Sequence, residues 1–378
     1  MDRLLEANAV ALLILALLVI AYYFPYTPQG IRTSTPTTTP LAPTTLPVLT
    51  APMATPATTP PTSKTASTVP LVSTAIPTST TTPTPTSKQG EDVKTTLNRL
   101  INAVLSKINE ERLKSGIPPV GLFNDTTARF RAEDMYSNKY FGHCDLSGMT
   151  PNYHYTKLGG SYVIEENVGY SYIIGGRLPP IDSAVKNVDN MIYNDAESGW
   201  GHRDSILDPT NNFVSIYAAW DDSRLFLVIH MMKVWVEWIT PPAVRNGAFT
   251  AEGRILLNGS KLYGVTIYRS SPNTSRTFNP RLNVLMTCSP YSIGEPIAGV
   301  VPEPYYYTEV KTIRPLKWVI SGQHFSVGFP VSFEDGGEGL YTIVVWAENT
   351  LHTKHPFDEG RYRDHLPVLE YTFSMRGG

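Results

Sequence analysis

The sequence has little of what marks several large classes of protein. Its 378 residues include two cysteines, Cys144 and Cys288, and no Cys-x-x-Cys pair, which excludes a disulfide-stapled miniprotein and a cysteine-rich zinc site. The net charge is −2, so no basic surplus exists to neutralise a phosphate backbone, and we expect no nucleic-acid partner. The Gly-x-Ser-x-Gly, His-Glu-x-x-His, Gly-x-Gly-x-x-Gly and phosphate-loop motifs are also missing. No familiar catalytic signature therefore assigns a reaction.

One long hydrophobic run lies near the N-terminus, after a short segment at 1–6. Residues 7–26 are an uncharged run of 20 residues, and about 20 helical residues span a hydrocarbon core of ~30 Å. No small-x-small cleavage pattern follows the run, so we favour an uncleaved transmembrane anchor over a cleaved signal peptide. The sequence predicts a single-pass protein of the cell membrane.

Threonine and proline dominate the segment at 27–91. Between Thr33 and Lys88, 39 of 56 residues are Thr, Ser or Pro, so this segment cannot form a packed core. Dense hydroxyls flanked by proline are typical of an O-glycosylated stalk outside a membrane, and an ordinary linker is the alternative. Sequons at Asn124, Asn258 and Asn273 also fit a glycoprotein. We predict a disordered stalk that carries extracellular folded domains.

Two folded regions are predicted beyond the stalk. The first, at 92–239, combines an amphipathic helix near 93–108, helices at 125–138 and 182–193, and strands at 214–220 and 224–236. Pro241 and Pro242 mark a boundary, and the region at 240–378 has no long helical stripe. Its short β-rich runs, separated by turn residues, lie at 254–257, 263–268, 324–329 and 339–347. The sequence predicts an α+β class in which an all-β, sandwich-like domain follows a mixed one.

Histidines and carboxylates stand at the ends of predicted elements in the first region. His143 follows the second helix, Glu165 and Glu166 open a strand-like run, and His202 lies in a Gly-His-Arg-Asp block. Two neutral imidazoles and one carboxylate can hold a zinc ion with an open position. The same three side chains can instead hydrogen-bond one another and tie loops together, because buried polar groups need partners.

Five blocks of residues resemble the CAP superfamily, the group of cysteine-rich secretory, antigen 5 and pathogenesis-related-1 proteins, in its prokaryotic SCP-like branch. They follow the order and spacing of that family at Ile108–Pro119, Arg131–Met135, Tyr140–Pro151, Glu166–Gly169 and Gly201–Pro209. The resemblance covers residues 92–239. It implies an α-β-α sandwich with an open cleft.

The resemblance also implies which side chains line the cleft. The family's two cleft histidines match His143 and His202, and its glutamate matches Glu166. The second family carboxylate has no clean match. The remaining candidates are Asp195 and Glu197, which lie near that position, and His230, a strand residue that faces the cleft or packs in the core.

Three uses of the cleft stay open at this point. In the first, His143, His202 and Glu166 have a structural role or bind a metal weakly, with zinc as the metal. In the second, they form the site of a metal-dependent extracellular hydrolase of peptidase type. In the third, they line a binding cleft for a glycan, lipid or peptide. We favour a non-enzymatic binding or adhesion module, because no nucleophile, water activator or oxyanion donor is identifiable.

Two further features do not depend on the resemblance. Cys144 and Cys288 either form a disulfide, which is permitted outside the cell, or remain two buried thiols. His352 and His355 lie among turn-forming residues, which predicts a solvated loop rather than a metal site.

Overall fold

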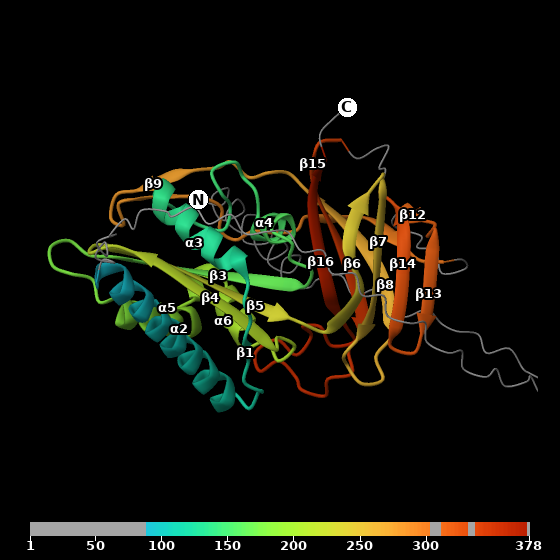
Figure 1. Ribbon diagram of the computed structural model, residues 1–378, viewed down its shortest axis with the longest axis horizontal. Helices are drawn as coiled ribbons and strands as arrows, with labels where there is room; N and C mark the ends of the chain where they lie inside the picture. The colour runs from blue at the N-terminus through green and yellow to red at the C-terminus, as the bar shows by residue number, and fades with distance from the viewer. Residues whose placement is uncertain (1–87, 303–310, 332–336, 376–378) are drawn as a thin grey trace, which may run out of the picture. The chain divides into compact units, whose positions relative to one another are not determined.

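The computed structural model describes residues 88–302, 311–331 and 337–375, which belong to one compact unit (Figure 1). The predicted segment at 1–6, the anchor at 7–26 and the stalk at 27–91, except its last four residues, lie outside these ranges. No helix within the described residues is long and apolar enough to cross a membrane. Helices and several mixed or antiparallel sheets are present, so the predicted α+β class is confirmed.

The helices lie in the first half of the described chain. Asp125 caps one of them, because its carboxylate accepts hydrogen bonds from the backbone N–H groups of Thr127 and Ala128. The predicted helices at 93–108, 125–138 and 182–193 are confirmed. The helical elements are α2 (Lys88–Lys114), α3 (Thr126–Asn138), α4 (Pro151–Lys157), α5 (Pro180–Tyr193), the 3-10 turn η1 (Ala196–Ser198) and α6 (Gly201–Ile206).

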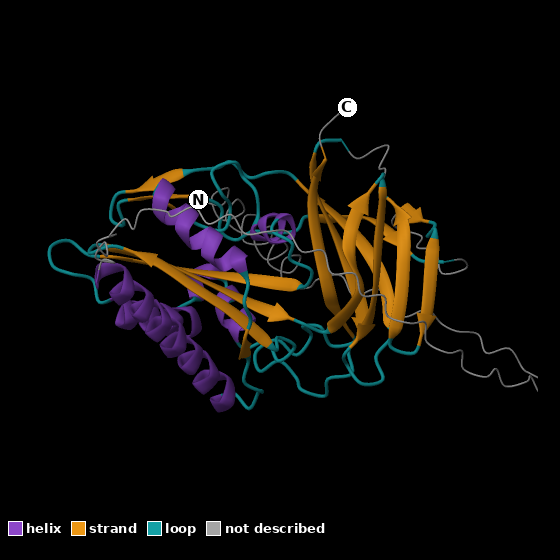
Figure 2. Cartoon of the chain, viewed as in Figure 1, coloured by secondary structure: helices purple, strands orange, loops and turns teal. Residues whose placement is uncertain are grey.

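A four-stranded sheet separates these helices into two groups. Helices α2, α5 and α6 lie on one face and α3 on the other (Figure 2). Along β5, Leu227 and Ile229 pack toward α2 and α5, whereas Phe226 and Val228 pack toward α3, because successive strand side chains point to opposite faces. The strand order is β1 (Gly121–Leu122), β4 (Phe213–Trp220), β5 (Arg224–Lys233) and β3 (Val163–Tyr172), antiparallel except for the β1–β4 pair.

Two further sheets enclose a second hydrophobic core, in which Phe249, Val265, Phe325 and Ile343 are fully or almost fully buried. The predicted strands at 263–268, 324–329 and 339–347 are confirmed. One sheet contains β12 (Lys311–Ile313), β11 (Glu295–Val300), β8 (Leu262–Ser270), β15 (Gly339–Glu348) and β16 (His365–Met375). The other contains β13 (Lys317–Ser321), β14 (His324–Pro330), β7 (Ala248–Ile255) and β6 (Val236–Arg245).

Two strand predictions near the middle of the chain are wrong in detail. The predicted strand at 224–236 is divided, since β5 ends at Lys233 and β6 begins at Val236. The run at 254–257 leaves the sheet where β7 ends, at Ile255. Pro241 and Pro242 lie inside β6, at the edge of its sheet, where a missing N–H need not break a ladder. The register with β7 shifts between Thr240 and Ala243.

Residues 271–294, which we call the strap, connect β8 to β11 and extend away from the two facing sheets. The strap contains β9 (Thr277–Asn279) and β10 (Val284–Met286), and β10 pairs in parallel with β2 (Tyr140–Phe141). Val284 is buried in the same cluster as the core side chains of α3. The C-terminal part of the sequence therefore completes the core above α3. Independent folding of 92–239 stays a prediction.

Candidate functional site

Glu166 is the centre of a buried charge cluster. It lies on β3 opposite His230 of β5, and the Glu166 and Arg131 side chains are fully buried. Glu166 Oε2 accepts hydrogen bonds from Arg131 Nε at 3.1 Å and His230 Nε2 at 3.2 Å. Oε1 contacts His143 Nδ1 at 3.2 Å and Arg131 Nη2 at 3.3 Å. Both carboxylate oxygens are therefore occupied by donors.

These donors decide the charge of Glu166. Burial alone raises the pKa of the carboxyl, but the Arg131 guanidinium and the hydrogen bonds from His143 and His230 hold that pKa well below its usual range. Burial lowers the pKa of His143, so this imidazole is neutral near pH 7. The neutral ring then donates its Nδ1 proton to Glu166.

Arg131 also fixes the segment that carries His143. Its guanidinium donates to the hydroxyl of Tyr140 at 2.8 Å and to the carbonyl oxygens of Gly142 and His143 at 2.9 and 2.8 Å. Arg131 thus joins β3 to the chain that follows β2. We infer that it positions the His143 imidazole, because one rigid fork of donors contacts both the carboxylate and the His143 backbone.

His202 belongs to a second pair of the same kind. Asp195 accepts hydrogen bonds from His202 Nδ1 at 2.7 Å and from the His202 backbone N–H at 2.9 Å. Burial raises the pKa of Asp195, but its hydrogen bond with His202 lowers the pKa below its usual value. The His143 and His202 rings are stacked with centroids 6.0 Å apart. Two carboxylate–histidine pairs therefore face each other.

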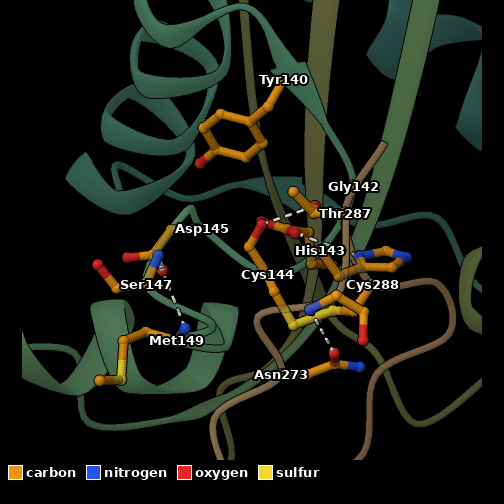
Figure 3. Close-up of a disulfide and its surroundings, with 12 residues drawn as sticks. Tyr140, Gly142, His143, Cys144, Asp145, Ser147, Met149, Asn273, Thr287 and Cys288 are labelled. Carbon is orange, nitrogen blue, oxygen red and sulfur yellow. Dashed lines mark hydrogen bonds and ion pairs between the residues drawn. A yellow bond between two sulfur atoms is a disulfide. The ribbon is translucent and has the colours of Figure 1, made fainter. Parts of the chain in front are cut away.

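The strap covers one side of this pair. Cys144 and Cys288 form a disulfide, and the His143 backbone N–H donates to the Cys288 carbonyl at 3.0 Å (Figure 3). Gly142 has φ +146°, and a Cβ there would meet the Thr287 side chain, so this close approach requires glycine. The Tyr291 ring lies 4.8 Å from the His143 ring. The His143 side chain is 7% exposed, against 17% for His202.

The sequence predictions map onto this site unequally. His143, Glu166, His202, Asp195 and His230 lie in the two linked groups of contacts described above. Glu197 is exposed on η1. The loop predicted around His352 is present, but its His355 is buried. The His355 ring contacts α6, where it hydrogen-bonds the Asp204 carbonyl at 2.8 Å. The prediction that His355 is solvated is wrong.

Three contributors to the site were not predicted as site residues from the sequence: Arg131, Asp125 and Tyr291. Arg131 had a detectable signal, because it falls on the same helical stripe as Ala128, Ala132 and Met135, which are all buried. A charged residue on an apolar stripe needs a buried partner. Tyr291 had no local signal, since its partners are more than a hundred residues away in sequence.

The two imidazoles present ring nitrogens that are not used in hydrogen bonds within the described residues. Within the described residues, no three His, Cys, Asp or Glu side chains are grouped so as to hold one metal ion. Nε2 of His143 and Nε2 of His202 have no hydrogen-bond partner in that part of the chain. Pairing of Nδ1 with a carboxylate is typical of zinc-binding histidines. Glu166 supports His143 here, and its oxygens contact Arg131, His143 and His230.

No protein-family model matches this chain, and no curated protein matches it either.

His230 makes the stability of this cluster depend on pH. Burial lowers its pKa, but hydrogen bonds to Asp125 and Glu166 outweigh burial and raise the pKa from 6.5 to about 9. Stabilisation by the imidazolium is therefore complete below pH 6.5 and is lost as the pH rises through 9. We expect the free energy of unfolding to fall by about 2–3 kcal/mol across that rise.

Urea titrations between pH 7.5 and 9.5 measure this loss. Burial raises the pKa of Glu370 to about 7, so this carboxyl has largely titrated below the window. His230→Gln should remove most of the slope, whereas His324→Gln, at an exposed position, should retain it. An equal slope in the wild type and His230→Gln would contradict the charge assignment.

Proposed function

We propose that this chain is a CAP-like protein of the cell surface that acts as a non-enzymatic binding or adhesion module. The five sequence blocks support the family assignment. The helices on both faces of the first sheet fit an α-β-α sandwich at 92–239, and the facing sheets beyond fit a β-sandwich at 240–378. The anchor at 7–26 and the glycosylated stalk at 27–91 would hold both domains outside the membrane.

The state of Glu166 is the observation that favours binding over hydrolysis. A water-activating base works best when its pKa lies near the operating pH and when an oxygen is free to accept the proton. Both Glu166 oxygens accept hydrogen bonds from Arg131, His143 or His230, and these contacts hold its pKa well below the usual range. A glycan, lipid or peptide remains the class of ligand for the cleft.

A divalent metal in the cleft would have the two imidazoles as its protein ligands, without Glu166. His143 and His202 would hold zinc through Nε2, while Glu166 and Asp195 keep both rings in the required tautomer through Nδ1. Bound zinc would supply Lewis acidity at the cleft. The protein residues would orient the rings and limit access, because the strap covers His143.

Zinc titration by calorimetry tests the role of the imidazoles. We expect binding near neutral pH that weakens on acidification, because protonated imidazole cannot bind a metal. His202→Ala should abolish the binding, and His324→Ala should not change it. If the cluster is structural only, His202→Ala should lower the free energy of unfolding by about 1–3 kcal/mol with no zinc binding in the wild type.

The same variants separate binding from catalysis. We expect no turnover of peptide or ester panels with added zinc. Turnover that chelation removes, zinc restores and His202→Ala abolishes would overturn the non-enzymatic assignment and support the metal-dependent hydrolase. Circular dichroism of each variant confirms that the fold is retained.

A further inference from the structure

A long loop between β15 and β16 forms a closed structure of its own. It spans residues 349–364, far beyond the 2–5 residues of an ordinary hairpin loop. Its ends meet, because the Asn349 backbone N–H donates to the Asp364 carbonyl at 2.9 Å and Asn349 Nδ2 donates to the Tyr362 carbonyl at 2.6 Å. Compact surface loops with closed ends frequently carry function.

His355 fixes the interior of this loop against α6. Its Nε2–H donates to the Asp204 carbonyl at 2.8 Å, and its Nδ1 accepts from the backbone N–H groups of Phe357 at 3.2 Å and Asp358 at 2.9 Å. The Arg203 guanidinium lies 4.2 Å from the centre of the Phe357 ring. The loop therefore presents a preformed wall, which lowers the entropic cost of binding a ligand.

A cavity of about 360 Å³ lies between this loop and Pro209–Thr210. Its volume is within the range of small-molecule sites, which begins near ~300 Å³. Basic side chains outnumber acidic ones in the lining, where Glu359 is the single carboxylate. The basic lining residues are His352, Lys354, His355, Arg361 and Arg363.

One basic residue of the lining is neutralised by carboxylates of the protein, whereas two others are available to bind a ligand. Arg361 donates to Asp208 Oδ2 at 3.0 Å and to Glu165 Oε1 at 2.8 Å, so two carboxylates fix it. Lys354 and Arg363 are exposed and have no ion-pair partner among the described residues. A guanidinium and an ammonium at one cavity suit an oxyanion, which both groups bind through charge-assisted hydrogen bonds.

We propose that this cavity binds a small organic anion through Lys354 and Arg363. The ligand class is a compact molecule with a carboxylate, phosphate or sulfate group, and a sugar acid is a ligand of suitable size. The site is separate from the Glu166 cleft and does not depend on the function proposed for it. Asn349 and Thr210 also line the cavity, but hydrogen bonds to Tyr362 and Asp208 hold their side chains within the protein, so the two cations are the groups offered to the ligand.

Calorimetry of the full chain with glucuronate, inorganic phosphate and glucose tests the proposal. We expect glucuronate to bind and glucose not to bind. Tighter binding of glucuronate than of phosphate would identify a sugar acid, and equal binding would identify recognition of the oxyanion alone. If neither glucuronate nor phosphate binds at a ligand concentration of about 10 mM, the proposal is overturned.

A charge-matched control separates the cavity from general electrostatic attraction. The double variant Lys354→Ala/Arg363→Ala should weaken glucuronate binding about tenfold or more, because both charge-assisted hydrogen bonds are lost. Arg254→Ala/Lys317→Ala removes the same charge from exposed residues of β7 and β13, and should leave the affinity unchanged. Equal weakening in the two variants would overturn the site assignment. Thermal unfolding of both variants checks that the fold is intact.

Discussion

Arg131→Met should lower the free energy of unfolding by about 3–5 kcal/mol, because it leaves the carboxylate of Glu166 buried without its strongest partner. The change also removes donors to Tyr140, Gly142 and His143. Methionine fills much of the same volume, so the loss reports the charge and its hydrogen bonds more than a cavity. Urea unfolding at pH 7, followed by circular dichroism, measures it.

Two companion variants identify the cause of that loss. Arg129→Ala, on the exposed side of the same helix, removes a surface pair with Glu133 and should cost less than about 1 kcal/mol. Arg131→Met/Glu166→Gln should recover part of the loss, since the second change removes the unpaired charge. A cost for Arg131→Met no greater than that for Arg129→Ala would refute the central role of the buried pair.

The local elements around the site could be predicted from the sequence because their signals are local. The helical stripe and the capping residue Asp125 locate α3. The sequence of β5 does not alternate between apolar and polar residues, because helices or the strap cover both of its faces. The break after β5 was missed. Lys233 is buried there and is held by Glu165 at 2.8 Å and Asp208 at 3.2 Å, both distant in sequence.

The site itself depends on contacts that no local pattern encodes. Glu166 meets His230 because of the register between β3 and β5, and Asp125 reaches His230 from the start of α3. The sequence left His230 between cleft and core, and the structure places it fully buried against Glu166. Tyr291 arrives on the strap, so its contact with His143 follows from tertiary structure alone.

Cys144→Ser/Cys288→Ser should lower the free energy of unfolding by about 3–5 kcal/mol, because the disulfide closes a long loop and restricts the unfolded chain. The two cysteines are 144 residues apart, and both are buried. Thr287→Ala is the matched control, since it removes a hydrogen bond to the Cys144 carbonyl beside the intact disulfide and should cost about 1 kcal/mol. Similar losses in the two variants would contradict the prediction.

The same double variant should expose His143 in the folded protein. β10 still pairs with β2 without the disulfide, but beyond Cys288 the Tyr291 contacts with His143 and the Glu166 backbone N–H are what hold the strap near the cleft. We therefore expect diethyl pyrocarbonate to modify His143 faster in the double variant, and in Tyr291→Ala, than in the wild type. The exposed His324 provides an internal reference whose rate should not change. If His143 stays equally protected in both variants, the strap does not limit access to the imidazole, and the cleft must be closed by the α3 side of the site instead.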